Sequence, residues 1–409
     1  MPQNIGDNRV IEDDIARISP EDARRISRYL VQQGDIVYSR RGDVERRALI
    51  RAREDGWLCG TGCLRERFGN GGVNPVYASY YLGHPSVREW IVRHAHGATM
   101  PNLNTSILSA LPFVIPSLEE QRAITHILGT LDDKIELNRR MNETLEAMVR
   151  ALFKSWFVDF DPVRAKAEGR DPSLPTGIAD LFPDRFVDSE LGEIPAGWEV
   201  AALEDYFDAM KGVSYKGSGL SKTGIPMHNL NSVYERGGYK YEGIKYYNGE
   251  YAERHLVEPG DVIVANTEQG HDRLLIGYVA IVPRLLGDLG IASHHIYRLR
   301  PKPGSPLTAS FLCQLLNSPQ MHDIVSGYAN GTTVNMLPID GVQKPKIIVP
   351  PQPLVTAFDR FATQAEGRRE EMVAESRILA TLRDTLLPKL ISGELRVKDT
   401  EPFIRSWTS

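Results

Sequence analysis

The sequence has few cysteines, no long hydrophobic run and, in its first part, no lysine. Cys59, Cys63 and Cys313 are the only cysteines among 409 residues, too few for a disulfide framework, so we expect a reducing environment. No apolar stretch approaches the roughly 20 residues of a membrane-spanning helix. The first residues, MPQNIGDNRVIEDD, are polar and acidic, unlike a secretory signal. The composition therefore predicts a cytoplasmic globular protein that does not span a membrane.

Motifs of catalytic sites are missing as well. The sequence contains no Gly-Lys-Ser/Thr phosphate loop and no Glu-x-Lys triplet of metal-dependent nucleases. Gly60-Thr61-Gly62 supplies only two glycines of a dinucleotide-binding loop, and Cys59 and Cys63 lack the second ligand pair of a zinc site. Asn74-Pro75-Val76-Tyr77 departs from the Asn-Pro-Pro-aromatic motif of amino-group methyltransferases, and we interpret it as a helix start. We therefore expect no metal, no cofactor and no catalytic centre in this chain.

Charge is unevenly distributed along the chain. The net charge of −5 by itself argues against nucleic-acid binding, because proteins that bind phosphates usually carry an excess of basic residues. In residues 1–113, however, arginine replaces lysine completely, and its planar guanidinium suits phosphates and guanine edges. A solvated surface is the alternative interpretation of this arginine cluster, which consists of Arg40, Arg41, Arg46, Arg47, Arg51, Arg53, Arg65 and Arg67.

The chain resembles itself at an offset of about 230 residues, which indicates a duplicated module. Residues 31–37 (VQQGDIV) match 257–263 (VEPGDVI), and in both a Gly-Asp turn opens a β-branched strand. Residues 97–103 likewise parallel 331–337. Each of these turns precedes a short apolar strand that ends in proline, and a long helical pattern follows. The order is therefore mixed module, helix, mixed module, helix.

The two helical patterns have the spacing of coiled-coil seams. Apolar residues recur every three or four positions from Leu118 to Trp156 and from Leu354 to Ser392. A few polar residues interrupt the seams, among them Asn138, Asn142 and Arg368. The apolar residues that we expect to pack between the helices or against a partner include Ile124, Leu131, Ile135, Leu145, Leu152, Phe361, Leu379, Leu382 and Leu386.

The two modules differ in length. Met1–Ile5 aligns with residues that lie about thirty positions inside the second module, so we expect the first module to lack an amino-terminal strand and turn. The predicted segments are 1–116, the first mixed domain; 117–157, the first long helix; 158–193, a connector; 194–350, the second mixed domain; 351–397, the second long helix; and 398–409, a tail.

An ordered set of motifs resembles the specificity (S) subunits of Type I restriction–modification systems. The resemblance covers residues 1–397 and is carried by IPSLEEQR (115–122), LDDKI (131–135), LFKSWFVDF (152–160), IPAGW (194–198) and LLPKLISGEL (386–395). The chain departs from the family in its shortened first module and in the start of its second long helix, PPQPL (350–354), which lacks Glu-Glu-Gln.

The resemblance implies an α+β fold with two mixed α/β target-recognition domains in pseudo-twofold repeat, separated by two long antiparallel coiled-coil helices. Each domain would read one half of a split double-stranded DNA target. Two methyltransferase (M) subunits would dock on the helices and restriction (R) subunits would join them. S-adenosylmethionine, Mg²⁺ and ATP would be used by these partners, for DNA adenine methylation and ATP-dependent cleavage. The alternatives are a decayed S subunit that binds only protein, and a stand-alone methyltransferase or nuclease.

Polar loops beside the repeated strands are the best candidates for DNA contacts. Arginine can bind guanine bidentately, and asparagine or glutamine can bind adenine in the same way, although turns use the same residues for structural reasons. We expect His294 and His295 to fill a core, with approach to DNA as the alternative. The candidate DNA-binding residues are Arg40, Arg41, Thr99 and Asn102 in the first module, and Asn266, Gln269, His271, Arg273, Thr332 and Asn335 in the second.

Overall fold

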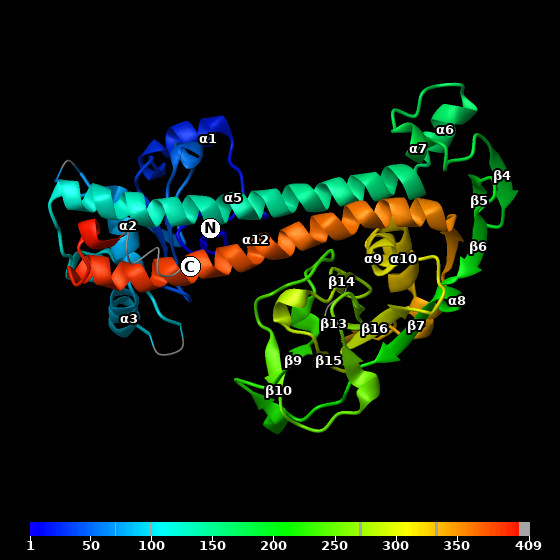
Figure 1. The fold of residues 1–409 in the computed structure, drawn as a ribbon. Helices are drawn as coiled ribbons and strands as arrows, with labels where there is room; N and C mark the ends of the chain where they lie inside the picture. Colours follow the sequence, from blue (N-terminus) through cyan, green and yellow to red (C-terminus); the bar gives the residue numbers. More distant parts are fainter. Residues whose placement is uncertain (70, 98–99, 270–271, 332–333, 401–409) are drawn as a thin grey trace. The chain divides into compact units, whose positions relative to one another are not determined.

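The computed structural model describes residues 1–400 apart from positions 70, 98–99, 270–271 and 332–333 (Figure 1). The chain divides into two compact units, unit 1 (Met1–Asn138 and Glu375–Ser409) and unit 2 (Arg139–Ala374). Two long helices, α5 (Leu118–Phe157) and α12 (Gln352–Ser392), each contribute one part to either unit. Within the described residues, no helix is both long and apolar enough to cross a membrane. The predicted α+β class with two long helices is confirmed.

Unit 1 contains a three-stranded antiparallel sheet in the order β2-β1-β3. The central strand β1 is the β-branched run after the Gly-Asp turn, and all four of its residues are buried. The elements of unit 1 besides the long helices are η1 (Pro2–Asn4), α1 (Pro20–Arg25), η2 (Ser27–Tyr29), β1 (Ile36–Ser39), β2 (Arg47–Leu49), η3 (Ala52–Glu54), β3 (Cys63–Glu66), α2 (Pro75–Gly83), α3 (Pro85–His94), α4 (Thr105–Ser109) and η8 (Val397–Asp399).

Unit 2 repeats this sheet and adds to it. Strands β14, β12 and β16 correspond to β2, β1 and β3, and a fourth strand, β7, pairs with the outer edge of β16. The strands of unit 2 are β4 (Phe186–Ser189), β5 (Gly192–Pro195), β6 (Glu199–Ala202), β7 (Phe207–Lys211), β8 (Leu220–Ser221), β9 (Ile225–His228), β10 (Lys245–Tyr247), β11 (Leu256–Val257), β12 (Val262–Ala265), β13 (Thr267–Gln269), β14 (Val279–Ile281), β15 (Gly290–Ala292), β16 (Ile296–Pro301), β17 (Val334–Met336) and β18 (Lys346–Val349).

A second sheet and several short helices complete unit 2. The second sheet has five strands in the order β11-β15-β9-β10-β8, and two-stranded ribbons join β13 to β17, β18 to β6 and β4 to β5. The helices of unit 2 besides α5 and α12 are α6 (Asp161–Ala167), α7 (Thr176–Ala179), α8 (Leu203–Tyr206), η4 (Gly217–Gly219), η5 (Leu230–Ser232), η6 (Glu253–His255), η7 (Arg284–Leu286), α9 (Ala309–Leu316), α10 (Pro319–Gly327) and α11 (Asp340–Gln343).

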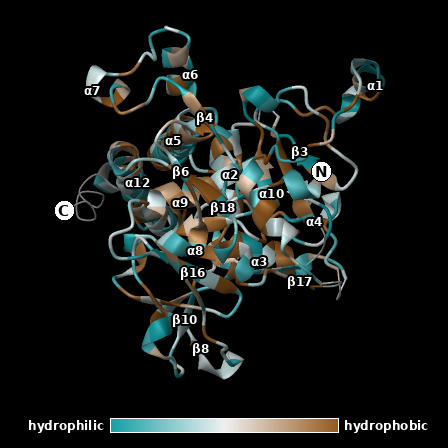
Figure 2. Cartoon of the chain, turned by 90° about the vertical axis from the view of Figure 1, so that its right-hand side faces the viewer, coloured by the Kyte–Doolittle hydropathy of each residue, from teal (hydrophilic) through white to brown (hydrophobic). Residues whose placement is uncertain are grey.

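Each unit packs its sheet and helices into one core together with parts of both long helices. In unit 1, Tyr38 of β1 shares a cluster with Leu128 of α5 and Leu386 of α12, and all three are fully buried. In unit 2, Phe153 of α5 and Phe358 of α12 pack with their ring centroids 5.6 Å apart. Figure 2 shows hydrophobic residues in brown where α9 and β18 join this core. Each long helix therefore packs apolar side chains into both cores, with each of its two parts contributing to the unit to which that part belongs.

Polar contacts show that the two helices run antiparallel within each unit. In unit 1 the Arg383 guanidinium donates to Asp132 over 2.7 Å, and the Asn138 amide donates to Glu375 over 2.7 Å. In unit 2 Arg369 contacts Glu146 at 3.2 Å. As the residue number increases along α5, the residue number of its partner on α12 therefore decreases. The predicted seam was wrong at Arg368, which is exposed, because the half-buried position there belongs to Arg369.

The structure gives the seam residues different degrees of burial. Ile124, Leu131, Leu382 and Leu386 are buried in the core of unit 1, and Ile135 is half-buried. The remaining predicted positions are partly buried against the core of their own unit: Leu145, Leu152 and Phe361 in unit 2, and Leu379 in unit 1.

Candidate nucleic-acid interface

The Gly-Asp turn is built in the same way in both units. Gly34 and Gly260 have φ angles of 91° and 94°, a left-handed conformation that favours glycine. Each following aspartate is buried and accepts a hydrogen bond from the backbone three residues earlier, over 2.8 Å in both cases. Asp35 also binds Arg67 through both carboxylate oxygens, at 2.7 and 2.6 Å. The turn therefore serves to anchor the sheet in each unit.

Asp261 makes the matching contact in unit 2. Its two carboxylate oxygens accept from Arg300 at 2.6 Å each, and Arg300 follows the same strand position on β16 that Arg67 follows on β3. Arg65 and Arg298 also correspond, because each donates to the backbone oxygen of a leucine, at 2.6 and 2.7 Å. The two modules therefore share a framework down to individual ion pairs.

The loop after the central strand meets the turn before the long helix in both units. In unit 1 the amide of Leu103 donates to the carbonyl of Arg40 over 2.9 Å, and in unit 2 the amide of Leu337 donates to the carbonyl of Asn266 over 2.8 Å. Leu103 and Leu337 are both buried. This pair of bonds makes Arg40 and Asn266 structurally equivalent, in the register that the matching segments 31–37 and 257–263 set.

The turn itself is closed by a second repeated pair of bonds. His96 and Asn102 exchange backbone hydrogen bonds of 3.0 and 2.7 Å, and Asn330 and Met336 exchange bonds of 3.0 and 2.8 Å. In unit 2, β13 also pairs with β17, so that Gln269 lies opposite Val334. The two groups of candidate residues that the sequence predicted separately are therefore neighbours in each unit.

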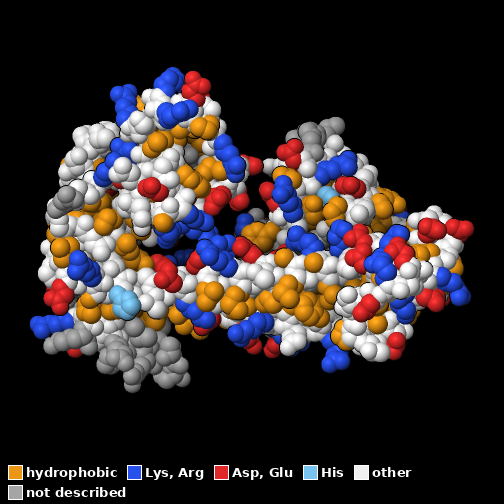
Figure 3. All heavy atoms as spheres, turned by 90° about the horizontal axis from the view of Figure 1, so that it is seen from above, with side chains coloured by type: hydrophobic (Ala, Val, Ile, Leu, Met, Phe, Trp, Pro, Cys, Tyr) orange, Lys and Arg blue, Asp and Glu red, His pale blue; other side chains and the backbone are white. Residues whose placement is uncertain are grey.

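Most arginines of the predicted cluster are engaged inside unit 1. Arg47 is buried and donates to the carbonyl of Ser79 over 2.9 Å. Ion pairs join Arg46 to Asp43, Arg53 to Glu12 and Glu54, and Arg65 and Arg67 to Asp35. Figure 3 accordingly shows acidic and basic side chains interspersed over the face in view.

Arg40 and Arg41 differ from the rest of this cluster. Both are exposed, and within the described part of unit 1 neither has an acidic partner at ion-pair distance. Arg41 forms a β-bridge with Asn102, which is half-buried. These two guanidinium groups are therefore free to contact a ligand beside the turn.

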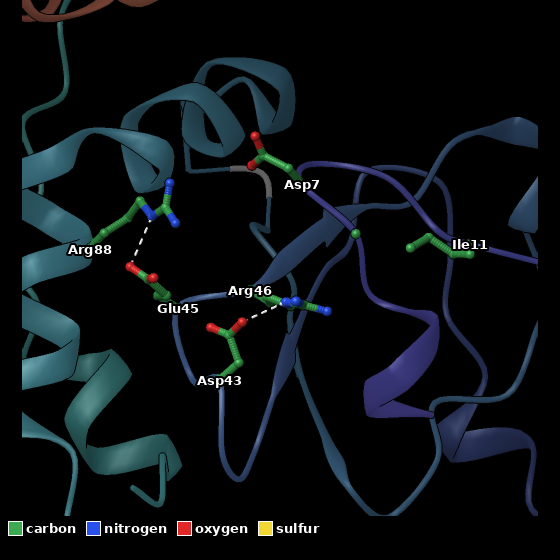
Figure 4. A pocket seen from close by; sticks show the side chains of 7 residues that line it. Asp7, Ile11, Asp43, Glu45, Arg46 and Arg88 are labelled. Atoms are coloured by element: carbon green, nitrogen blue, oxygen red, sulfur yellow. Dashed lines mark hydrogen bonds and ion pairs between the residues drawn. The ribbon is translucent and has the colours of Figure 1, made fainter. Parts of the chain in front are cut away.

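A cavity of about 390 Å³ lies beside the loop that joins β1 to β2 (Figure 4). Its two guanidinium groups are already paired, Arg46 with Asp43 at 2.6 Å and Arg88 with Glu45 at 3.0 Å. Asp7 adds a further carboxylate to the wall. The wall therefore carries three carboxylates and two guanidinium groups, an acidic excess that does not favour a phosphate ligand.

The candidates of unit 2 occupy different environments. Gln269 and Arg273 are exposed, and Arg273 has a φ of 51°. Asn335 is half-buried on β17. Asn266 is buried, and its amide nitrogen donates to the carbonyl of His294 over 3.1 Å. The candidates Thr99, His271 and Thr332 lie outside the described residues.

Two motifs that we interpreted structurally can now be placed. Asn74 caps the start of α2, where its side-chain oxygen accepts from the amides of Val76 and Tyr77, as expected for Asn-Pro at a helix start. His294 and His295, which we expected to fill a core, are half-exposed instead. That prediction was wrong because the β15–β16 turn joins the ends of strands in two different sheets, where both histidines keep part of their surface exposed.

The sequence did not predict other residues that lie near the β15–β16 turn. Tyr215 follows β7 and lies near His294, with ring centroids 5.8 Å apart. Lys211 ends β7 and Lys245 begins β10. These strands have no counterpart in the described part of unit 1, so the internal repeat gave no signal for them.

Known proteins resemble the chain in sequence. Residues 4–147 match the family described as "Type I restriction modification DNA specificity domain". The chain is 26% identical over 356 residues to the Type I restriction enzyme HindI specificity subunit of Haemophilus influenzae, which covers 75% of this chain and 73% of that protein. It is 27% identical over 333 residues to the MjaIX specificity subunit of Methanocaldococcus jannaschii, with coverage of 80% and 71%.

A solved structure has a similar fold. The Type I restriction–modification S subunit from M. genitalium aligns with a TM-score of 0.54 over 88% of this chain and 84% of that one, at 15% identity. These findings agree with the duplicated modules and the two long helices. Residues 4–147 carry a Type I restriction modification DNA specificity domain, and the chain is similar over most of its length to the specificity subunits of such systems.

Proposed function

We propose that the chain reads a bipartite DNA target, one half with each module. The observation that carries this proposal is the repeated framework with different side chains on it. The same backbone bond holds Arg40 in unit 1 and Asn266 in unit 2, and these residue types favour different bases. Two readers built on one framework suit two half-sites of different sequence.

The side chains proposed to contact DNA are exposed or lie beside the loop–turn junction. In unit 1 these are Arg40, Arg41 and Asn102. In unit 2 they are Gln269 and Arg273, which are exposed, and Asn335 on β17, which is half-buried. Thr99, Asn266, His271 and Thr332 stay candidates on sequence grounds.

The long helices are proposed to carry the protein partners. Two methyltransferase subunits would dock on them, and restriction subunits would join that assembly in the cytoplasm. Large apolar side chains exposed on α5, namely Leu137, Met141 and Met148, support a role in protein binding. S-adenosylmethionine, Mg²⁺ and ATP would then be bound by these partners rather than by this chain.

The deciding experiment maps methylated bases across a genome with and without this gene, in the presence of its methyltransferase. We expect one bipartite motif to appear. Replacing residues 195–345 with the corresponding module of another S subunit should change only one half of that motif. If both halves changed, or neither did, independent reading by the two modules would be wrong.

Two controls separate the alternatives. The purified chain incubated with DNA and labelled S-adenosylmethionine should transfer no methyl group; transfer would identify a stand-alone methyltransferase. A complex that assembles with the methyltransferase yet protects no defined sequence would identify an adaptor that binds only protein.

A further inference from the structure

The turn between β15 and β16 connects the two sheets of unit 2 and is held from two sides. Asn266 grips it from one side, because its backbone amide donates to the carbonyl of His295 over 3.1 Å and its side-chain amide donates to the carbonyl of His294. From the other side, the amide of His294 donates to the carbonyl of Val213 over 2.9 Å. The turn is therefore fixed between the reading loop and the end of β7.

Glycine is required where β7 meets this turn. A Cβ atom on Gly212 would lie 2.2 Å from the carbonyl oxygen of Ser293, closer than any side chain tolerates. The close approach fixes where the backbone of the two histidines lies. A rigid backbone is what a recognition element needs, because loosely held side chains lose discrimination.

The side chains of this turn form a polar cluster. The rings of His294 and His295 lie 3.8 Å apart, and the His295 Nδ1 lies 3.1 Å from the Thr267 hydroxyl. Within the described part of unit 2, three buried polar atoms here have no hydrogen-bond partner: Oδ1 of Asn266, Oγ of Ser293 and Nδ1 of His294. Buried polar atoms without protein partners are unusual, and they leave this cluster with unused hydrogen-bonding capacity beside the two imidazole rings.

The corresponding turn of unit 1 carries different side chains. There the amide of Arg40 donates to the carbonyl of Gly62 over 2.9 Å, as that of Asn266 does to His295. His295 therefore takes the place of a glycine, and His294 that of Thr61. A position where the backbone is repeated and the side chain changes is where two modules can differ in the sequence they read.

We propose that His294 and His295 contact base edges in the half-site read by unit 2. The proposal rests on the proposed function, which makes DNA the ligand, and names a specificity element within it. The Nδ1 atom of His295 is bonded to Thr267 and that of His294 is buried, so Nε2 is the ring nitrogen that each residue can offer to a base edge. A neutral imidazole can donate or accept there, according to its tautomer, and major-groove base edges differ in where they carry donors and acceptors.

Electrostatics at the turn keep one of these rings neutral. Burial, followed by the positive charges of His294, Lys211 and Lys245, lowers the pKa of His295. The ring is therefore neutral near pH 7, with Nδ1 bonded to Thr267 and Nε2 left for a ligand, while Lys211 and Lys245 add positive charge that attracts the phosphate backbone. Attraction by the lysines brings DNA to the turn, and the imidazoles then distinguish bases.

The test uses the complex of the full chain with its methyltransferase subunits. His294→Ala and His295→Ala are compared with the parent and with His255→Ala, a matched control in the same unit on η6. Affinity is measured for the cognate duplex and for duplexes with one base pair changed at each position of either half-site. We expect each variant to lose discrimination about 5- to 150-fold at one or two adjacent positions of one half-site, with the other half-site and the control unchanged.

Two results would overturn the inference. One is unchanged discrimination at every position in both variants, and the other is an equal loss of affinity for all duplexes, which indicates a phosphate contact. His295→Leu keeps a side chain of similar bulk without a hydrogen-bonding group and provides the same test if the alanine variant unfolds. A different result would contradict the proposed function itself, namely a parent complex that shows no preference for any bipartite sequence.

Discussion

The two buried aspartates of the Gly-Asp turns allow a matched test of the duplicated framework. Asp35 and Asp261 are 1% and 4% exposed, and each accepts two hydrogen bonds from an arginine and one from the backbone. Asp35→Asn and Asp261→Asn keep the size of the side chain and one acceptor for the turn. The second oxygen becomes an NH₂ group that faces a guanidinium, so the charged pair is lost.

The size of the effect follows from exposure. Breaking a fully buried ion pair costs about 3–5 kcal/mol, but Arg67 and Arg300 are 40% and 37% exposed, so water can take over part of their solvation. We therefore expect each variant to destabilise its own unit by about 2–3 kcal/mol. Amide exchange that proceeds through opening of that unit should accelerate about 30- to 150-fold.

Hydrogen exchange with mass spectrometry measures this unit by unit. In Asp35→Asn, peptides that cover β1, β2 and β3 should exchange faster while those that cover β12, β14 and β16 stay unchanged. Asp261→Asn should give the opposite result. Equal acceleration in both units, or none in either, would refute the view that each turn anchors its own sheet.

Three further predictions concern unit 1. Arg40→Ala and Arg41→Ala, made singly, should weaken recognition of one half-site by about 5- to 150-fold; binding to cognate and half-scrambled duplexes at two salt concentrations checks this, and equal affinity for every duplex would reduce them to surface charge. Leu131→Glu or Leu382→Glu places a charge in the core of unit 1 at a cost of several kcal/mol, so co-purification with the methyltransferase should fail, and undiminished co-purification would contradict helix packing. Burial raises the pKa of Glu66 to about 7, above its unfolded value, so the protonated carboxyl favours folding and unit 1 should lose stability as the pH rises through 7. Glu66→Gln should abolish this loss in thermal melts at pH 8 and change little near pH 5.

The sequence predicted the parts of the fold that depend on local pattern. The β-branched runs after Gly34 and Gly260 became the central strands β1 and β12, and the three- and four-residue spacing gave both long helices. The matched segments 31–37 and 257–263 also align Arg40 with Asn266. The tertiary backbone bonds from Leu103 and Leu337 that hold these two positions could not be predicted, because they join distant segments. The predicted seam position at Arg368 was wrong for a related reason, because Arg369 is the residue that pairs with Glu146 on the other helix.

The candidate site was predicted less completely than the fold. Sequence analysis named both loops of each module, and the structure brings them together through Leu103 and Leu337. The sequence did not predict Tyr215, which follows β7 and lies near His294, or Lys245, which begins β10, because neither strand is part of the repeat. It also could not separate Arg40 and Arg41 from the neighbouring arginines, because ion pairing depends on which acids the fold places nearby.

Internal ion pairing explains how a chain with net charge −5 can be specific for DNA. An arginine that is bound to a buried aspartate, as Arg67 is to Asp35, stabilises the fold and contributes little attraction to phosphates. Non-specific affinity depends on neutralised phosphates, so each guanidinium held by a carboxylate in this way contributes less to binding of arbitrary sequence. The ratio of specific to non-specific binding then rises without any additional base contact. This arrangement leaves the selection of sequence to exposed side chains without an acidic partner among the described residues of unit 1, such as Arg40 and Arg41.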